Sequence, residues 1–231
     1  MWGKSKAKAA NQGSTSGGFR VRVYPEDAFP PDALPFLVTR PFAAGLIEAV
    51  VLDYPDSIRL LNRSELGDLH PTELFSNAIY TSIHEEESYV ESMEYAGVPY
   101  RAIGGTHRYI SSHLHALNRY VDVEATPYGA LVSIPLPEYV FVHAIGRDTN
   151  VASALVVLQQ VTETFFDEGE RAISPQLYWW RPGADKYTQV PSGRVPELRP
   201  VGARLNPSDG FIEFFGSDTA ELVQLWSADQ P

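Results

Sequence analysis

The chain has 231 residues, 44% of them hydrophobic and 12% aromatic, which is enough for a sizeable core in one large domain or two small ones. Because it contains no cysteine, disulfide frameworks, thiolate zinc sites, iron–sulfur clusters and cysteine nucleophiles are excluded. A formal net charge of −11, from 29 acidic and 18 basic residues, disfavours nucleic acid and anionic membranes as partners. It fits either a basic protein partner or acidity that serves solubility.

Residues 1–18 are rich in Lys, Ser, Gly, Ala and Asn, and this composition predicts a disordered tail. No apolar run follows Lys4, Lys6 and Lys8, so we expect neither a signal peptide nor a membrane anchor. The absence of cysteine fits a reducing compartment, and the cytoplasm is the expected location. Alternating apolar and polar residues at 19–24 predict that order begins with a strand.

The next predicted elements are a hairpin and an amphipathic helix. The apolar runs 46–54 and 58–62 are separated by a stretch with proline and aspartate, which favour a turn. Pro71 suits the first position of a helix, and one apolar face follows it at helical spacing, made of Leu74, Phe75, Ala78, Ile79 and Ile83. The continuation at 85–94 is acidic and predicts a solvated face, with Glu85, Glu86, Glu87, Glu91 and Glu94.

The second half of the chain predicts core strands at 128–134 and 139–145 and a helix at 149–166 that is buried on more than one side. A strand at 173–181 is predicted to turn at Pro182-Gly183 and to pair with 187–190. The pattern leaves the type of structure at 202–231 open. We therefore expect an α+β fold of mixed, mainly antiparallel strands with two or three packed helices. It forms a single domain over 19–231, with a possible division near residue 100.

Three histidines crowd into the stretch RAIGGTHRYISSHLHALNRYVD, at 107, 113 and 115. If residues 109–120 are helical, His113 and His115 lie about 200° apart around the axis and cannot share one ion. His107 stands outside that helix. The spacing therefore predicts no metal site.

The same stretch is also a candidate site for binding an anion. The pair Gly104-Gly105 before a helix suggests exposed backbone N–H groups, with His107, Arg108 and His113 as further ligand-binding candidates. A turn that requires positive φ at the glycines explains them equally well. The phosphate-loop and dinucleotide patterns are absent, so no cofactor is expected.

Catalytic patterns are also missing. The serines at 111, 112 and 174 sit in no GxSxG elbow, and their expected roles are capping and turns. The carboxylates at 85–94 belong to a run predicted to be exposed, where acid–base catalysis is disfavoured. His143 is expected to be a hydrogen-bonded core or edge residue of its strand.

The run Tyr178-Trp179-Trp180-Arg181 is the most aromatic in the chain. Strand alternation sends Trp179 one way and its two aromatic neighbours the other, so a large ring outside the core is one of two interpretations. An exposed tryptophan beside arginine is a candidate for protein binding, and plain core packing is the alternative.

An ordered series of segments resembles the YtpQ-like family of uncharacterised bacterial proteins. The segments are LIEAVVLDYPDSIRLL, LHPTELFSNAIYTSI, RYISSHLHAL, ALVSIPLPEYVFV and AISPQLYWW followed by RPG, and together they span approximately 35–183. The resemblance implies an intracellular α+β domain and carries over no catalytic residue. This chain differs from the family pattern at His107-Arg108 and Leu136-Pro137.

The sequence leaves two hypotheses for the function of the protein. The first is a non-enzymatic, cytoplasmic protein-binding domain of adaptor or immunity-like type, which uses Glu85, Glu86, Glu87 and the aromatic run at 178–181. The second is a small anionic-ligand binder, or an enzyme, that uses the segment from Gly104 to His113.

Overall fold

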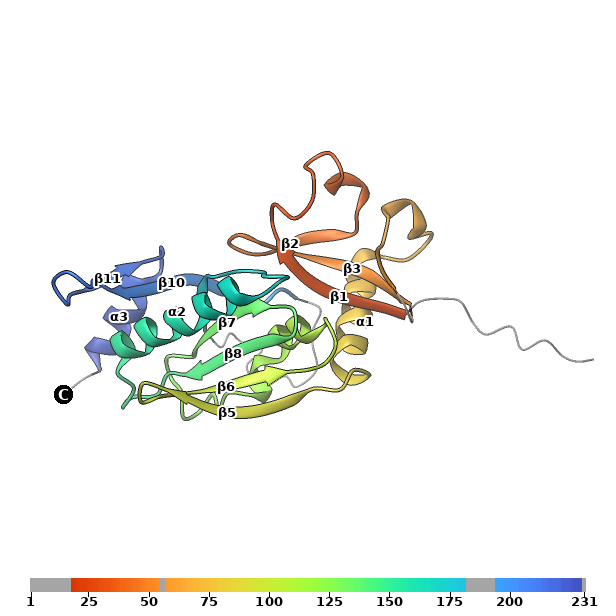
Figure 1. Ribbon diagram of the computed structural model, residues 1–231. Coiled ribbons are helices and arrows are strands. Elements are labelled where there is room, and N and C mark those ends of the chain that lie inside the picture. The colour runs from red at the N-terminus through yellow and green to blue at the C-terminus, as the bar shows by residue number, and fades with distance from the viewer. Residues whose placement is uncertain (1–17, 55–56, 182–193, 230–231) are drawn as a thin grey trace, which may run out of the picture.

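The computed structural model describes residues 18–54, 57–181 and 194–229 (Figure 1). Within these residues two sheets combine with three α-helices and three short 3-10 helices, which confirms the expected α+β class. All strand pairs in the two sheets are antiparallel, as the strand and turn pattern predicts.

The N-terminal sheet contains four strands in the order β1-β3-β2, with β4 also paired to β3. Its strands are β1 (Gly18–Pro25), β2 (Thr39–Ala43), β3 (Leu46–Tyr54) and β4 (Ser57–Leu60). The strand expected at 19–24 and the hairpin expected from the runs 46–54 and 58–62 are confirmed. The predicted tail lies outside the described residues except for Gly18, which begins β1.

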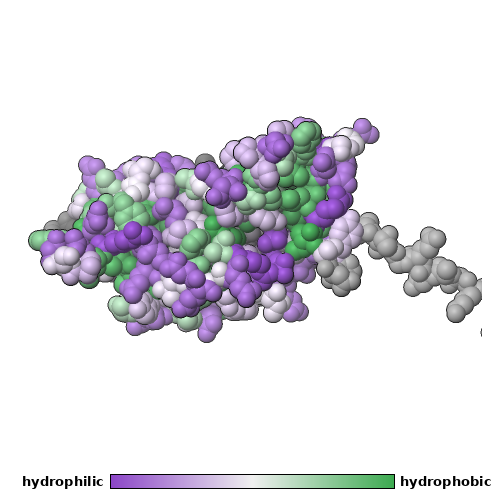
Figure 2. All heavy atoms as spheres, turned by 45° about the horizontal axis from the view of Figure 1, so that its top comes forward, coloured by the Kyte–Doolittle hydropathy of each residue, from purple (hydrophilic) through white to green (hydrophobic). Residues whose placement is uncertain are grey.

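Two 3-10 helices, η1 (Leu34–Phe36) and η2 (Arg63–Glu65), lie in the connections of this sheet. Phe36 is 63% exposed. The broadest apolar area on the face shown in Figure 2 lies over this part of the molecule.

Helix α1 (Pro71–His84) packs against the N-terminal sheet. Its predicted apolar face is confirmed, because all five of those side chains are buried. The helix begins at Pro71, where the Thr72 N–H donates to the imidazole of His70, and it ends at His84. The acidic segment 85–94 leaves the helix and enters a strand, and four of its five glutamates are exposed, as a solvated face requires, while Glu86 is half-buried.

The larger sheet has seven strands in the order β11-β10-β9-β7-β8-β6-β5. Its strands are β5 (Tyr89–Tyr95), β6 (Val98–Gly104), β7 (Ala130–Leu136), β8 (Tyr139–Ala144), β9 (Leu177–Trp180), β10 (Leu198–Leu205) and β11 (Ile212–Phe215). The strands predicted at 128–134 and 139–145 are confirmed as β7 and β8. The strand predicted at 173–181 is shorter, because Ser174 accepts the N–H of Gln176 in a turn before β9.

The partners of β9 in the described chain are β7 and β10. The predicted turn at Pro182-Gly183 and its partner at 187–190 lie outside the described residues. The stretch 202–231, which the sequence pattern leaves open, contributes the end of β10, β11 and helix α3 (Thr219–Ala228).

Helix α2 (Val151–Glu168) covers one face of the larger sheet (Figure 1). Its first turn is capped by Asn150, whose side chain accepts the N–H of Ser153. Val157 and Val161 are buried as well as Leu155 and Leu158, which confirms burial on more than one side.

The opposite face of the larger sheet is covered by η3 (Ile110–Arg119), which lies between the two sheets and touches β1, α1 and β8. The helix expected at 109–120 is of 3-10 type, and Ala116 breaks it with a non-helical φ of −131°. One apolar cluster joins Val23 and Leu46 of the N-terminal sheet to Ile103 and Val142 of the larger one through this segment. The chain passes from one sheet to the other between α1 and β5.

Candidate functional site

Each of the two glycines before η3 lies where a Cβ would meet a neighbouring side chain. A Cβ on Gly104 would lie 2.5 Å from the Tyr89 ring, and one on Gly105 would lie 2.7 Å from Ile110 Cδ1. Neither glycine has a positive φ, so the prediction of a positive-φ turn is wrong. The Gly105 N–H donates to the Glu138 carbonyl, 3.3 Å away, so this amide is already paired.

His107 is held against the start of η3. Its Nδ1 accepts the N–H of Tyr109 at 3.1 Å, and the two rings stack at 5.8 Å. Burial lowers the pKa of His107, which favours the neutral ring with its hydrogen on Nε2. That Nε2 is buried and lies near the Glu87 carbonyl, and the Tyr109 hydroxyl lies near the Asp53 carboxylate, but neither atom makes a well-formed hydrogen bond in the described chain. Arg108, between them, is exposed.

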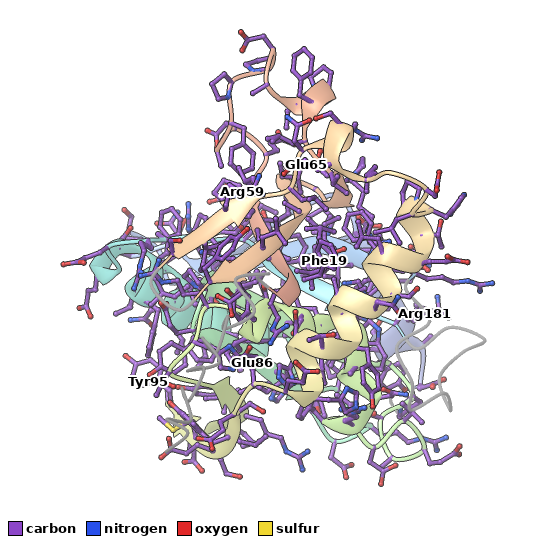
Figure 3. All side chains as sticks on the ribbon, turned by 90° about the vertical axis from the view of Figure 1, so that its right-hand side faces the viewer. Phe19, Arg59, Glu65, Glu86, Tyr95 and Arg181 are labelled. Carbon is purple, nitrogen blue, oxygen red and sulfur yellow. The ribbon has the colours of Figure 1, made fainter. Side chains whose placement is uncertain are left out.

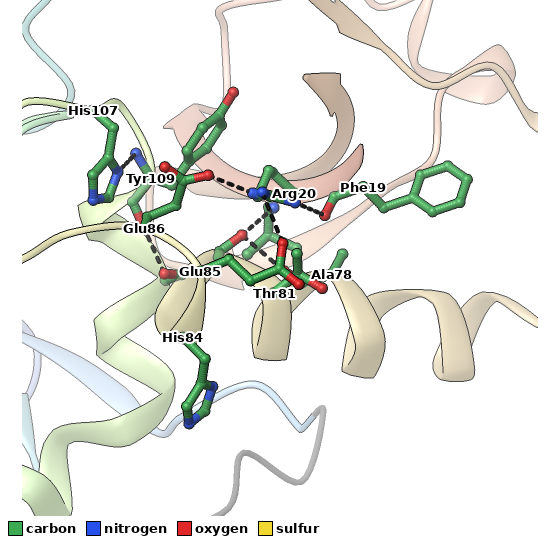
Figure 4. Close-up of polar contacts among 12 residues, drawn as sticks. Phe19, Arg20, Ala78, Thr81, His84, Glu85, Glu86, His107 and Tyr109 are labelled. Carbon is green, nitrogen blue, oxygen red and sulfur yellow. Dashed lines mark hydrogen bonds and ion pairs between the residues drawn. The ribbon is translucent and has the colours of Figure 1, made fainter. Parts of the chain in front are cut away.

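The acidic residues after α1 lie beside this segment (Figures 3 and 4). Arg20 of β1 is 8% exposed and donates to Glu86 at 2.7 Å, to Glu85 at 3.2 Å and to the Phe19 carbonyl at 3.1 Å. The negative charge of Glu86 raises the pKa of His107 and so partly opposes the effect of burial. The structure therefore brings the two sequence-predicted regions, 85–87 and 104–113, together at the end of β1, with Glu85 and Glu86 committed to Arg20.

The histidines of η3 face different partners, as their spacing predicts. His113 contacts the Tyr120 hydroxyl through Nδ1, and burial lowers its pKa to about 4. His115 instead lies 2.5 Å from Glu48 and 2.9 Å from the Arg194 carbonyl. In the described part of the chain, no group of three His, Asp or Glu side chains is arranged to hold a metal ion.

Glu48 is a buried residue that the sequence analysis did not single out. Its side chain is fully buried between the His115 ring and the Arg40 guanidinium, which is 2.6 Å away. Burial alone raises the pKa of this carboxyl, but His115 and Arg40 outweigh burial and hold the pKa below its usual value. The strand pattern could have predicted this burial, because Glu48 alternates with Leu46 and Val50 and therefore lies on the same inward face of β3.

A cleft of about 1140 Å³ opens where β6 and β8 separate. Their pairing stops at Arg101 and Val142, and beyond it His143 spans the gap by contacting the Pro99 carbonyl through Nδ1 at 2.5 Å. His143 is 6% exposed, and burial lowers its pKa, so it is the buried strand residue that its pattern predicts. Arg101 and the first turn of α2 also line the cleft. None of the five predicted ligand-binding residues does.

The aromatic run is buried. Tyr178, Trp179 and Trp180 are 1%, 0% and 8% exposed, so of the two interpretations core packing is confirmed and a large ring outside the core is wrong. Strand alternation does send Trp179 to the face under α2 and its neighbours to the face under η3. Both faces are covered, and only the Arg181 side chain, 48% exposed, reaches solvent among these four residues.

Strands β1 and β5 each lie at the edge of a sheet, but only the edge of β1 is covered by side chains of other elements. At β1, the outward N–H groups of Val21 and Val23 donate to the hydroxyls of Ser82 in α1 and Ser111 in η3, at 2.9 and 3.2 Å. This contact of Ser111 with a distant strand differs from the capping or turn role expected of the serines. The edge of β1 is therefore closed by buried side chains.

Strand β5 is the contrasting case. It ends the strand order of the larger sheet, and all seven of its residues are exposed. Four are large and apolar, with exposed fractions of 46% for Tyr89, 50% for Val90, 36% for Met93 and 46% for Tyr95. Figure 3 shows Tyr95 at the periphery of the molecule. Sequence reasoning found the acidic residues of this strand but missed the apolar ones between them.

No protein-family model, curated protein or solved structure compared with this chain matches it. Among the described residues, none of the helices is both long and apolar enough to cross a membrane.

Proposed function

We propose that this protein is a non-enzymatic protein-binding domain, of cytoplasmic adaptor or immunity-like type, whose binding surface is the edge of β5. The observation that carries the proposal is a seven-residue edge strand with four exposed large apolar side chains. Open edges of this kind pair readily with other chains, and proteins usually protect them. Membership of the YtpQ-like family belongs to the same proposal and is supported by the ordered sequence segments.

The contrast with β1 supports a binding role. The same chain closes the edge of β1 with Ser82 and Ser111, so its helices supply hydroxyl groups to one edge. At β5 the side chains that protect natural edges are limited to Glu91 and Glu94. These carboxylates disfavour pairing with a second acidic strand and leave the edge open to a partner of opposite charge.

The test is capture of partners from a lysate of the source cells by the immobilised chain and by two matched variants. Val90→Lys with Met93→Lys changes β5, and Ile212→Lys with Phe214→Lys changes equally exposed residues of the opposite edge strand, β11. We expect the β11 variant to retain what the wild type retains, and the β5 variant to retain roughly tenfold less, because apolar contacts supply most of the energy of such interfaces. Equal capture by both variants, with unchanged melting temperatures, would contradict the proposal.

The second candidate function is the binding of a small anion at 107–113. It is supported by the buried His113 Nε2, which has no hydrogen-bond partner in the described chain, because buried groups of this kind are rare unless water or a ligand pairs with them. His107 Nε2 and the Tyr109 hydroxyl lie nearby and make no well-formed hydrogen bond to Glu87 or Asp53. Inorganic phosphate at about 10 mM is then expected to raise the melting temperature of the wild type but not that of His107→Ala. An identical response of the two proteins would exclude this candidate.

A further inference from the structure

We infer that the partner of the β5 edge is an extended, basic segment that joins the larger sheet as an additional antiparallel strand. The inference rests on the proposed function and specifies the partner. Its first ground is the backbone, because β5 pairs with β6 over its whole length, from Tyr89 opposite Gly104 to Tyr95 opposite Val98. A strand paired on one side presents a row of N–H and C=O groups on the other, which an extended segment can match.

The second ground is the distribution of side chains over the two faces of β5. Tyr89, Glu91, Met93 and Tyr95 share the face on which Tyr100 and Ala102 of β6 pack under α2, because paired residues of adjacent strands lie on the same face. Val90, Ser92 and Glu94 lie on the other face. One face of β5 therefore carries Glu91 with three exposed apolar side chains, and the other carries Glu94 with a single one, Val90.

The third ground is charge. Residues 85–95 contain five glutamates and no basic residue. Arg20 forms ion pairs with both Glu85 and Glu86 and offsets one of their two charges. In the part of the chain that the structure describes, the carboxylates of Glu87, Glu91 and Glu94 have no ion pair or hydrogen bond. Three unneutralised negative charges along an open edge select a cationic partner and oppose a second copy of this chain, whose own edge carries the same charges.

These three observations predict the residue types at each position of the partner strand. In an antiparallel partner strand, the residues opposite Glu94 and Glu91 are three positions apart and project to opposite faces. Lysine or arginine is expected at both positions, with β-branched or apolar residues opposite Met93 and Val90. A capped heptapeptide with the sequence Val-Lys-Val-Thr-Lys-Val-Thr presents this pattern from Tyr95 to Tyr89.

The experiment titrates this heptapeptide into the full-length chain and follows backbone amide signals by NMR, together with hydrogen exchange of the β5 amides. We expect shifts centred on β5 and slower exchange of its amides in the complex. The double variant Glu91→Lys with Glu94→Lys is expected to bind roughly tenfold more weakly, because each exposed charge pair contributes modestly. Glu213→Lys on β11 provides the matched charge control and is expected to bind like the wild type.

Further peptides separate strand pairing from simple charge attraction. The same heptapeptide with alternate residues N-methylated keeps its lysines but loses backbone donors, and it is expected not to bind. Equal binding of the methylated peptide, or no binding of the parent peptide, would overturn the inference. In the latter case, capture that still depends on Val90 and Met93 would leave the proposed function standing. Dimers of the chain that dissociate in the β5 variant would assign the edge to a second copy and would also overturn the inference.

Discussion

Replacement of Glu48 by alanine is expected to lower the free energy of unfolding by about 3–5 kcal/mol, because the buried guanidinium of Arg40 and the buried ring of His115 lose the carboxylate that they share. The Glu48 side chain is fully buried, the His115 side chain is 1% exposed and the Arg40 side chain is 20% exposed. Arg40 also stacks over Phe75 of α1 at 4.0 Å, so the charged group lies where the N-terminal sheet meets both helices that pack on it. Urea unfolding of the wild type and the variant measures the loss.

The chain provides a matched control for this prediction in the same sheet. Arg59 and Glu65 form an ion pair at 2.7 Å, but both side chains are well exposed (Figure 3). Exposed pairs of this kind contribute little, since water solvates the charges in either state. Glu65 also accepts the N–H of Asn62 at the start of η2. Glu65→Ala is therefore expected to cost only the small contribution of this exposed cap, far less than Glu48→Ala. A Glu48→Ala variant that is as stable as Glu65→Ala would show that the buried carboxylate does not hold the N-terminal sheet and its two helices together.

The depressed pKa of Glu48 also fixes a direction for the pH dependence. A carboxyl whose pKa is lower in the folded state stabilises the fold at pH values above its unfolded pKa, and this contribution is lost as the pH falls through the folded value. Glu48→Gln is consequently expected to show a shallower loss of stability than the wild type below about pH 4.5. Parallel acid unfolding curves for the two proteins would contradict this expectation.

The sequence predicts most of this fold because local patterns decide most of its elements. Helix α1 follows from Pro71 and one apolar face, and the β3–β4 hairpin follows from two apolar runs around a turn. Prediction fails where distant segments decide the outcome. The 3-10 form of η3 is an example, since this segment is buried on nearly all sides between two sheets and cannot be read from its own period.

The same distinction between local pattern and distant contacts applies to the candidate site. The acidic charges of β5 are visible in the sequence, but its edge position depends on the strand order of a seven-stranded sheet. The predicted anion site at Gly104 and Gly105 reflects a requirement for small residues beside Tyr89 and Ile110, which lie in other elements. Strand periodicity correctly gives alternating faces to Tyr178 and Trp179, but it contains no information about whether each face is covered.

The burial of the aromatic run leads to the second large effect, at Trp179. Its side chain is fully buried, its indole N–H donates to the Tyr128 carbonyl at 2.6 Å, and the guanidinium groups of Arg181 and Arg199 lie 5.7 Å from the ring. Trp179→Ala is expected to cost about 3–5 kcal/mol through the cavity it leaves under α2. Chemical denaturation of the two proteins measures this cost.

Two further variants separate the contributions at this position. Trp179→Phe keeps most of the apolar volume but removes the N–H donor to Tyr128, so it is expected to lose about 1–3 kcal/mol, less than the alanine variant. Tyr89→Ala removes a ring of comparable size from the exposed face of β5 and is expected to leave stability almost unchanged. If Trp179→Ala unfolded like the wild type but lost its partners in the capture experiment, the ring would be a binding residue. The contacts of Trp179 predict the reverse, so loss of partners in that variant is expected to follow loss of folded protein.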